Sequence, residues 1–177
     1  MKNRRTVQIV ILALFVLLGG YTIASGLFEE KEPLPEAGKS VPLFELESLD
    51  GTAMDLEQFR GHPVVINFWG TFCEPCVREM PLIQKYYEEY KDDGLVVIGV
   101  NLDEPKLRVQ KFAEQVGVSF PILLDPGSTI RKRYGVVSYP TTFFIDADGI
   151  LSSEKIGEMK ELDMKSHLSR IMDIPVK

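Results

Sequence analysis

Two cysteines are the residues of this chain best suited to do chemistry. Cys73 and Cys76 are the only cysteines among 177 residues, and two residues separate them. An apolar run at 64–68 precedes them and an amphipathic stretch at 77–90 follows, which predicts a buried strand, a turn and a helix holding both sulfurs. Free N–H groups and the dipole at a helix N-terminus favour a thiolate. The pattern predicts thiol–disulfide exchange, with Cys73 as nucleophile and Cys76 as resolving thiol.

Two other uses of the cysteine pair are less well supported. A purely structural disulfide is disfavoured because so short a loop restricts the unfolded chain little. A structural zinc ion usually takes four Cys or His ligands. The only histidines, His62 and His167, lack metal-ligand spacing and are interpreted as surface residues. We therefore expect no metal site.

Length and composition exclude several classes of protein. A chain of 177 residues suits one domain with an appendage, and 45% apolar residues support a proper core. The net charge of −6 and the lack of a basic patch with interleaved aromatic residues argue against nucleic-acid binding.

The N-terminus resembles a membrane anchor. Lys2, Arg4 and Arg5 precede an almost uninterrupted apolar run at 7–27, which spans roughly 30 Å as a helix. The basic flank predicts that the N-terminus stays inside and that the rest is exported. A cleaved signal peptide is the alternative, with a weak cleavage site at 22–24.

Three segments follow from this reading. We expect an anchor at 1–28, a charged, proline-containing linker at 29–40, and a folded domain at 41–177. The domain would lie outside the cytoplasm, where disulfides persist.

Strand and helix patterns alternate along the folded domain. Strands are predicted at 44–48, 64–68, 95–101, 119–124, 141–145 and 150–156, and helices at 74–90, 106–116, 128–134 and 161–172, with one helical turn at 55–59. The stretch from 64 to 101 forms a βαβ unit, and the last two strands form a hairpin. This order predicts an α/β fold with a mixed sheet.

Several motifs resemble the thioredoxin family. A strand runs into Trp69, the helix after Cys73-x-x-Cys76 contains Pro81, and the segment 138–142 resembles the cis-proline loop of that family. The resemblance covers about 39–172. It implies a thioredoxin-like mixed central sheet flanked by helices.

Other features resemble the ResA-type members in particular. An inserted helix–strand segment at about 103–124 matches extracytoplasmic members, and the Glu74–Pro75 dipeptide, the anchor and 67–71 match the ResA type. These are membrane-anchored thiol-disulfide oxidoreductases of cytochrome c maturation in Gram-positive bacteria. The resemblance implies a single-pass membrane protein that reduces the haem-binding CxxCH disulfide of apocytochrome c. It also implies re-reduction by a CcdA-type membrane thiol donor, no bound cofactor besides the redox-active disulfide, and a monomeric domain.

Glu79 is the third predicted catalytic residue. Cytoplasmic thioredoxins carry a buried acid where this chain has Asn67, which cannot titrate. Glu79 lies three residues after Cys76, so the two share a helix face. ResA-like proteins use a glutamate at this position for thiol proton transfer, as the resemblance implies. An ordinary exposed helix carboxylate is the alternative.

The dipeptide between the cysteines is predicted to tune the redox potential. The charge of Glu74 opposes thiolate formation, which raises the thiol pKa and makes the protein a reductant, with Pro75 as part of the same motif. The alternative is that Glu74 points into solvent and is screened.

Substrate contacts are expected around the proline loop. In the family this loop packs against the disulfide and offers backbone groups to an extended peptide, which implicates Tyr139, a cis Pro140 and Thr141. Trp69 is interpreted either as a wall of the active site or as a core residue.

Three rival functions remain open. A spore-envelope paralogue would use the same chemistry on another substrate. A peroxiredoxin-type peroxidase needs Thr-x-x-Cys, whereas Thr71 is two residues before Cys73. A non-enzymatic haem- or apocytochrome-binding module is the third.

Overall fold

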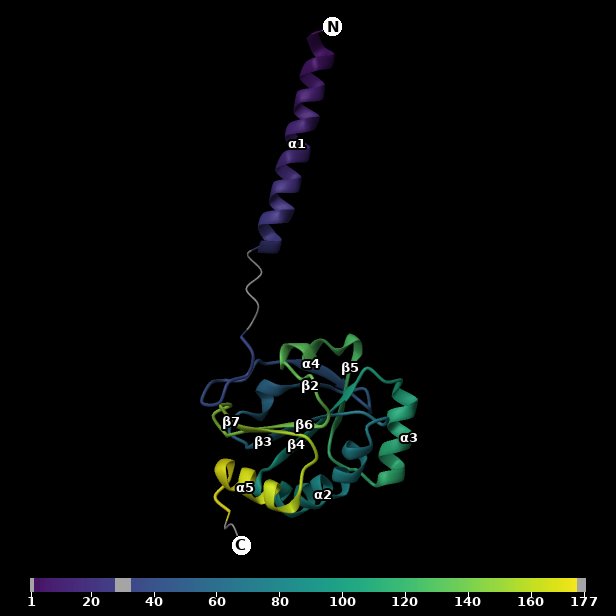
Figure 1. Cartoon of the computed structure of the whole chain (residues 1–177), viewed down its shortest axis with the longest axis vertical. Helices are drawn as coiled ribbons and strands as arrows, with labels where there is room; N and C mark the ends of the chain where they lie inside the picture. Colours follow the sequence, from purple (N-terminus) through teal and green to yellow (C-terminus); the bar gives the residue numbers. More distant parts are fainter. Residues whose placement is uncertain (1, 28–32, 175–177) are drawn as a thin grey trace. The chain divides into compact units, whose positions relative to one another are not determined.

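The computed structural model describes residues 2–27 and 33–174 (Figure 1). Its contacts divide the chain into two units, Met1–Pro33 and Leu34–Lys177. The first unit contains helix α1 (Lys2–Leu27). Among the described residues, no helix is both long and apolar enough to cross a bilayer. The membrane anchor expected at 1–28 stays a prediction.

The second unit begins before the expected domain boundary at residue 41. The backbone N–H of Gly38 donates to the Leu151 carbonyl at 2.8 Å, and the N–H of Leu151 donates to the Lys39 carbonyl at 2.9 Å. Part of the expected linker at 29–40 is therefore attached to the sheet, and its residues 29–32 lie outside the described part of the chain.

A seven-stranded mixed sheet forms the centre of the second unit. The strands are β1 (Glu45–Ser48), β2 (Ala53–Asp55), β3 (Val64–Trp69), β4 (Val96–Leu102), β5 (Ile122–Asp125), β6 (Thr141–Ile145) and β7 (Leu151–Ile156). Their order is β2-β1-β5-β4-β3-β6-β7. Strands β3, β4 and β5 are parallel to one another, whereas β6 runs antiparallel to β3 and β7 antiparallel to β6. The predicted mixed α/β sheet is confirmed.

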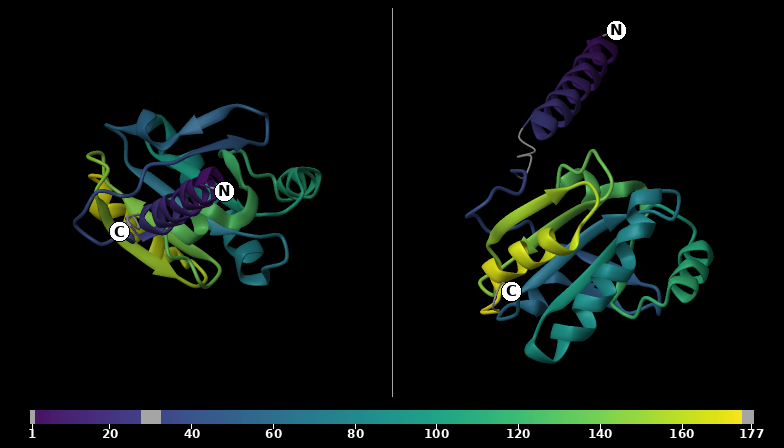
Figure 2. Two further views of the ribbon diagram at one scale, coloured as in Figure 1. Left: turned by 90° about the horizontal axis from the view of Figure 1, so that it is seen from above. Right: turned by 60° about the horizontal axis from the view of Figure 1, so that its bottom comes forward.

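Helices cover both faces of this sheet. They are α2 (Glu74–Tyr90), α3 (Lys106–Val116), α4 (Thr129–Arg133) and α5 (Glu161–Ile171). Buried side chains of α2, α3 and α5 share one apolar cluster, and α4 contributes to a second cluster on the opposite face. Figure 2 shows α2 and α5 side by side, where Lys85 and Tyr86 of α2 both bind Glu161 at 2.9 Å.

Strand β3 is buried along its whole length because both faces of the sheet are covered. Alternate residues point to opposite faces: Val65 and Trp69 join the cluster under α2, whereas Ile66 and Phe68 join the other. The same alternation places Asn67, a fully buried polar residue, on the α2 side. This strand therefore brings a carboxamide to the face on which the cysteines lie.

One strand was not predicted, and one expectation needs correction. Strand β2 has three residues, which are too few to show a periodic pattern. His62 is exposed, but His167 is half-buried: its ring stacks on Phe144 at a centroid distance of 4.5 Å, and Nδ1 lies 2.8 Å from the Ser153 hydroxyl. The second histidine contributes to packing.

Candidate active site

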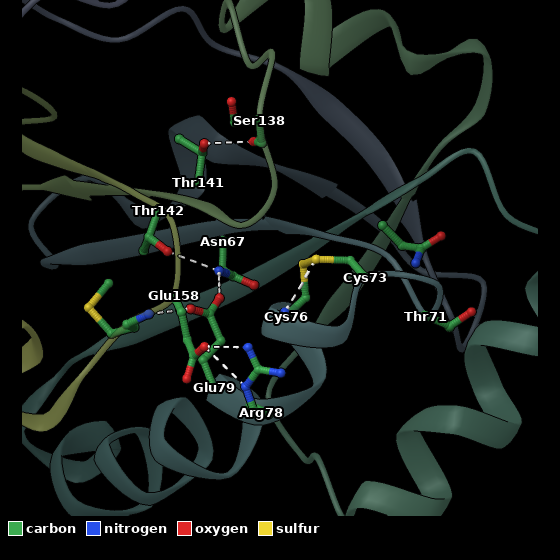
Figure 3. Close-up of a disulfide and its surroundings, with 12 residues drawn as sticks. Asn67, Thr71, Cys73, Cys76, Arg78, Glu79, Ser138, Thr141, Thr142 and Glu158 are labelled. Atoms are coloured by element: carbon green, nitrogen blue, oxygen red, sulfur yellow. Dashed lines mark hydrogen bonds and ion pairs between the residues drawn. A yellow bond between two sulfur atoms is a disulfide. The ribbon is translucent and has the colours of Figure 1, made fainter.

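A disulfide joins Cys73 and Cys76 at the start of α2 (Figure 3). Cys73 is the N-cap residue of the helix, and its sulfur accepts a hydrogen bond from the Cys76 N–H at 3.3 Å. Cys73 keeps 8% of its surface exposed and Cys76 none. A substrate therefore reaches Cys73 first, at the end of the helix where the dipole stabilises a thiolate.

Glu79 lies one helical turn after Cys76 on α2 and is buried, with 1% of its surface exposed. One carboxylate oxygen accepts from the Asn67 side-chain N–H at 2.7 Å and the other from the Met159 backbone N–H at 2.6 Å. Burial raises the pKa of Glu79 to about 7, against the lowering effect of these hydrogen bonds. The alternative of an ordinary exposed carboxylate is wrong, because α2 turns this residue toward the sheet.

The amide donor to Glu79 comes from β3. Asn67 also donates to the Thr142 hydroxyl at 2.9 Å, so its nitrogen bridges α2 and β6. Asn67 stands where cytoplasmic thioredoxins carry a buried acid, and its amide holds Glu79 in position. Glu79 itself is the buried carboxylate of this site.

Glu74 points away from the buried carboxylate. Its side chain is 87% exposed and pairs with Arg78 at 2.8 Å, while Arg78 also binds Glu158 at 2.7 Å. The alternative that Glu74 points into solvent is therefore correct. Pro75 occupies the first turn of α2, where its missing N–H costs no hydrogen bond.

The proline loop precedes β6. The Tyr139–Pro140 peptide is cis, as the resemblance implied, and the Pro140 carbonyl accepts from the Gly157 N–H at 2.8 Å. Half-buried Tyr139 meets the exposed ring of Phe72, edge to face, at 6.3 Å between centroids. Val137 is also exposed. An apolar surface therefore borders the loop.

Two predicted substrate contacts are not available at this surface. Trp69 has no exposed surface and packs on Phe112 at 5.2 Å between ring centroids, so its alternative role as a core residue is correct. Thr141 is buried, and its hydroxyl donates to the Ser138 carbonyl at 2.9 Å. Its side chain therefore holds the loop in shape.

Sequence reasoning missed Glu104 and Met159. Glu104 accepts from the Thr71 N–H at 2.7 Å, from the Thr71 hydroxyl at 2.5 Å and from the Asn101 amide at 2.9 Å. Burial opposes ionisation of Glu104, but these hydrogen bonds outweigh it and lower its pKa. Asn101, a polar residue in the buried strand β4, and Glu104, three residues later, were a usable signal. Met159 binds Glu79 through its backbone N–H, so its residue type gave no signal in the sequence.

Comparisons with known proteins agree with this geometry. A family model described as the AhpC/TSA family matches residues 37–153. The thiol-disulfide oxidoreductase ResA of Geobacillus thermodenitrificans is 41% identical over 170 residues, which cover 96% of this chain and 97% of that protein. ResA of Halalkalibacterium halodurans is 40% identical over 160 residues, 90% of each chain.

Two solved structures share the fold. The thiol:disulfide interchange protein DsbE of Chlorobium tepidum superposes with a TM-score of 0.71 at 30% identity, over 77% of this chain and 96% of that one. StoA of Bacillus subtilis superposes with a TM-score of 0.63 at 27% identity, over 73% of this chain and 99% of that one. The chain belongs to the AhpC/TSA family of thioredoxin-like proteins and, within it, to the ResA-type thiol-disulfide oxidoreductases.

Proposed function

We propose that this oxidoreductase works as a reductase of protein disulfides outside the cytoplasm, and that its substrate is the haem-binding CxxCH disulfide of apocytochrome c. One observation carries the proposal: a buried carboxylate with a pKa of about 7, Glu79, follows Cys76 by one turn of α2, and Cys73 is the less buried of the two cysteines. A group of this pKa exchanges protons with thiols at neutral pH, which efficient disulfide exchange requires.

The proposed cycle has two exchange steps. The Cys73 thiolate attacks one substrate sulfur, so a Cys73–substrate disulfide forms and the other substrate sulfur leaves as a thiolate that takes up a proton. Cys76 then loses its proton to Glu79 and attacks Cys73. This second step forms the Cys73–Cys76 disulfide and releases the second substrate thiol. Two electrons pass from the protein to the substrate.

The surface around the proline loop supports a peptide substrate. Tyr139 lies outside the strands, next to the exposed apolar side chains of Phe72 and Val137. An extended segment pairing with the loop backbone would place its cysteines over Cys73, and main-chain recognition of this kind tolerates varied sequence. We take Tyr139 as the substrate-binding residue of this proposal. Pro140 is buried and its carbonyl accepts from Gly157, so its part is to shape the loop through the cis bond.

The location and the electron donor are part of the proposal. The apolar run at 7–27 and the basic residues before it support a single-pass anchor with its N-terminus inside. A reductase in an oxidising compartment needs electrons from across the membrane, which a CcdA-type thiol donor would supply. No other bound cofactor is needed for this exchange, because the cysteine pair carries both electrons.

The peroxidase alternative is less well supported than disulfide exchange. The Thr71 hydroxyl donates to Glu104, so it is occupied away from the cysteine it would have to assist. A spore-envelope substrate and a haem-binding role without catalysis are outcomes of the experiment below.

Substrate trapping tests the proposal. In the full-length Cys76→Ser variant the mixed disulfide cannot be resolved, so apocytochrome c with an oxidised CxxCH should accumulate on Cys73. The Cys73→Ser variant is the matched control and should trap nothing. Capture of a spore-envelope protein instead of apocytochrome c would show that the proposed substrate is wrong. Haem binding by a variant lacking both cysteines, together with no reduction of insulin disulfides by the wild type, would support the non-enzymatic module.

A further inference from the structure

The side-chain amide of Asn67 has a fixed orientation. Its nitrogen donates to the Glu79 carboxylate at 2.7 Å and to the Thr142 hydroxyl at 2.9 Å. When Glu79 is ionised, its carboxylate can only accept, so the amide then cannot be turned around without losing this bond. The oxygen of Asn67 must therefore point in the remaining direction.

That direction is toward the cysteines. Figure 3 shows the Asn67 oxygen turned toward the Cys73–Cys76 disulfide, while its nitrogen faces Glu79 and Thr142. Asn67 and Cys76 are both fully buried, and the alternation along β3 places Asn67 on the face that α2 covers. Strand β3 and the helix that follows it thus turn a carbonyl oxygen toward the sulfurs.

The Asn67 oxygen accepts no hydrogen bond from any residue that the structure describes. Buried polar atoms are nearly always paired, so an orphaned acceptor needs an explanation. The disulfide has no hydrogen to give. Reduction adds two electrons and two protons, breaks the S–S bond and turns Cys76 into a thiol, which is a weak donor.

We propose that in the reduced protein the Cys76 thiol donates a hydrogen bond to the Asn67 oxygen, which makes Asn67 a positioning residue for the resolving sulfur. The functional part of the inference rests on the proposed exchange cycle, in which Cys76 is a thiol until the second step. Asn67 then holds the thiol through its oxygen and the proton acceptor Glu79 through its nitrogen. One rigid carboxamide therefore fixes the positions of both the Cys76 thiol and the Glu79 carboxylate for the second exchange step.

The infrared S–H stretching band tests this contact directly. In the full-length Cys73→Ser variant, Cys76 is the only thiol of the chain and no disulfide forms. We expect its band below the frequency of a thiol without a hydrogen bond. Adding Asn67→Leu should raise the frequency, because leucine has a similar shape and no acceptor. Adding Thr142→Val is the matched control and should leave the band in place.

Two further variants keep the test decisive. If Asn67→Leu does not fold, Asn67→Asp retains an acceptor at the same position and should keep the low frequency. A band that moves with Glu79→Gln, but not with Asn67→Leu, would show that Glu79 is the acceptor and overturn the inference. A band of Cys73→Ser already at the frequency of an unbonded thiol would also overturn it. Neither result touches the proposed function, which the trapping experiment tests separately.

The redox equilibrium with glutathione is an independent test of the hydrogen bond between Cys76 and Asn67. The proposed hydrogen bond exists only in the reduced form, so its loss in Asn67→Leu should shift the equilibrium with glutathione toward the disulfide, by about three- to tenfold. Thr142→Val should stay within about twofold of the wild type. An unshifted Asn67→Leu equilibrium in a folded protein would contradict the inference.

Discussion

The backbone N–H of Met159 donates to the Glu79 carboxylate at 2.6 Å, across 80 residues of sequence. The contact ties the start of α2 to the segment before α5, and an ion pair between Arg78 and Glu158 at 2.7 Å lies beside it. Glu79 is thus held by a backbone donor and by Asn67 at once. The packing of α2, β3 and the segment before α5 therefore fixes the Glu79 carboxylate, which is the proposed proton acceptor.

Glu79 should control the pH dependence of disulfide exchange. Its pKa of about 7 predicts that the rate of exchange with a peptide disulfide rises as the pH increases through that value, because the ionised carboxylate accepts the thiol proton. Glu79→Gln should slow exchange at pH 8 by about 10²-fold or more and remove this inflection. Stopped-flow fluorescence over pH 5–9 measures both. An inflection that persists in the variant would assign the proton to another group.

The same carboxyl should make folding stability depend on pH. Its folded pKa of about 7 lies above the ordinary 4.5, so the protonated form favours the folded state. The resulting stability is complete below pH 4.5 and is lost as the pH rises through 7; a shift of this size corresponds to roughly 3 kcal/mol. The contribution of Glu79 to the free energy of unfolding of the oxidised wild type, measured in urea, should therefore be larger at pH 5 than at pH 8.

The Glu79→Gln variant is the control for that measurement. No thiol titrates in the oxidised protein, and the histidines are common to both proteins. The difference in stability between pH 5 and pH 8 should therefore change in the variant by the contribution that Glu79 makes. Equal differences in the two proteins would show that Glu79 titrates normally.

Cys73 should react before Cys76. In the oxidised structure Cys73 is partly exposed at the helix N-terminus and Cys76 is fully buried. A limiting amount of iodoacetamide added to the reduced protein should label Cys73 first, as peptide mass spectrometry would show. Preferential labelling of Cys76 would reverse the two roles.

Glu74 should have only a small influence on the redox potential. Its charge is exposed and paired with Arg78, and such charges are strongly screened. We expect the wild-type potential to lie nearer that of thioredoxin, about −270 mV, than that of the strong oxidant DsbA, about −120 mV. Glu74→Gln should make the protein more oxidising by less than about 30 mV. A wild type that equilibrates with glutathione as a strong oxidant would contradict the reductase proposal.

The N-terminal run should keep the protein on membranes. Residues 7–27 are almost uninterruptedly apolar, so the protein should stay in the membrane fraction after a high-salt wash. Protease added to intact protoplasts should remove the folded unit. Recovery of mature protein from the medium, beginning near Ser25, would instead indicate a cleaved signal peptide.

Local sequence determined the chemistry of this protein. The spacing of Cys73 and Cys76, the apolar strand before them and the Tyr139–Pro140 segment each depend on a few consecutive residues, whose geometry follows from backbone rules. The alternation of strand and helix patterns likewise predicted the mixed sheet. Short-range patterns of this kind are sufficient to predict the redox motif and the fold class.

Tertiary structure decided which side chains reach the site. Whether Glu79 is buried depends on how α2 packs on β3 and on a backbone donor 80 residues away. Trp69 proved to be a core residue because Phe112, on the later helix α3, covers it. The side-chain oxygen of Asn67 lacks a partner among the described residues because the packing of α2 on β3 makes Glu79 bind the nitrogen of the same amide. Contacts between distant segments set burial, and burial sets the charge and reactivity of these groups.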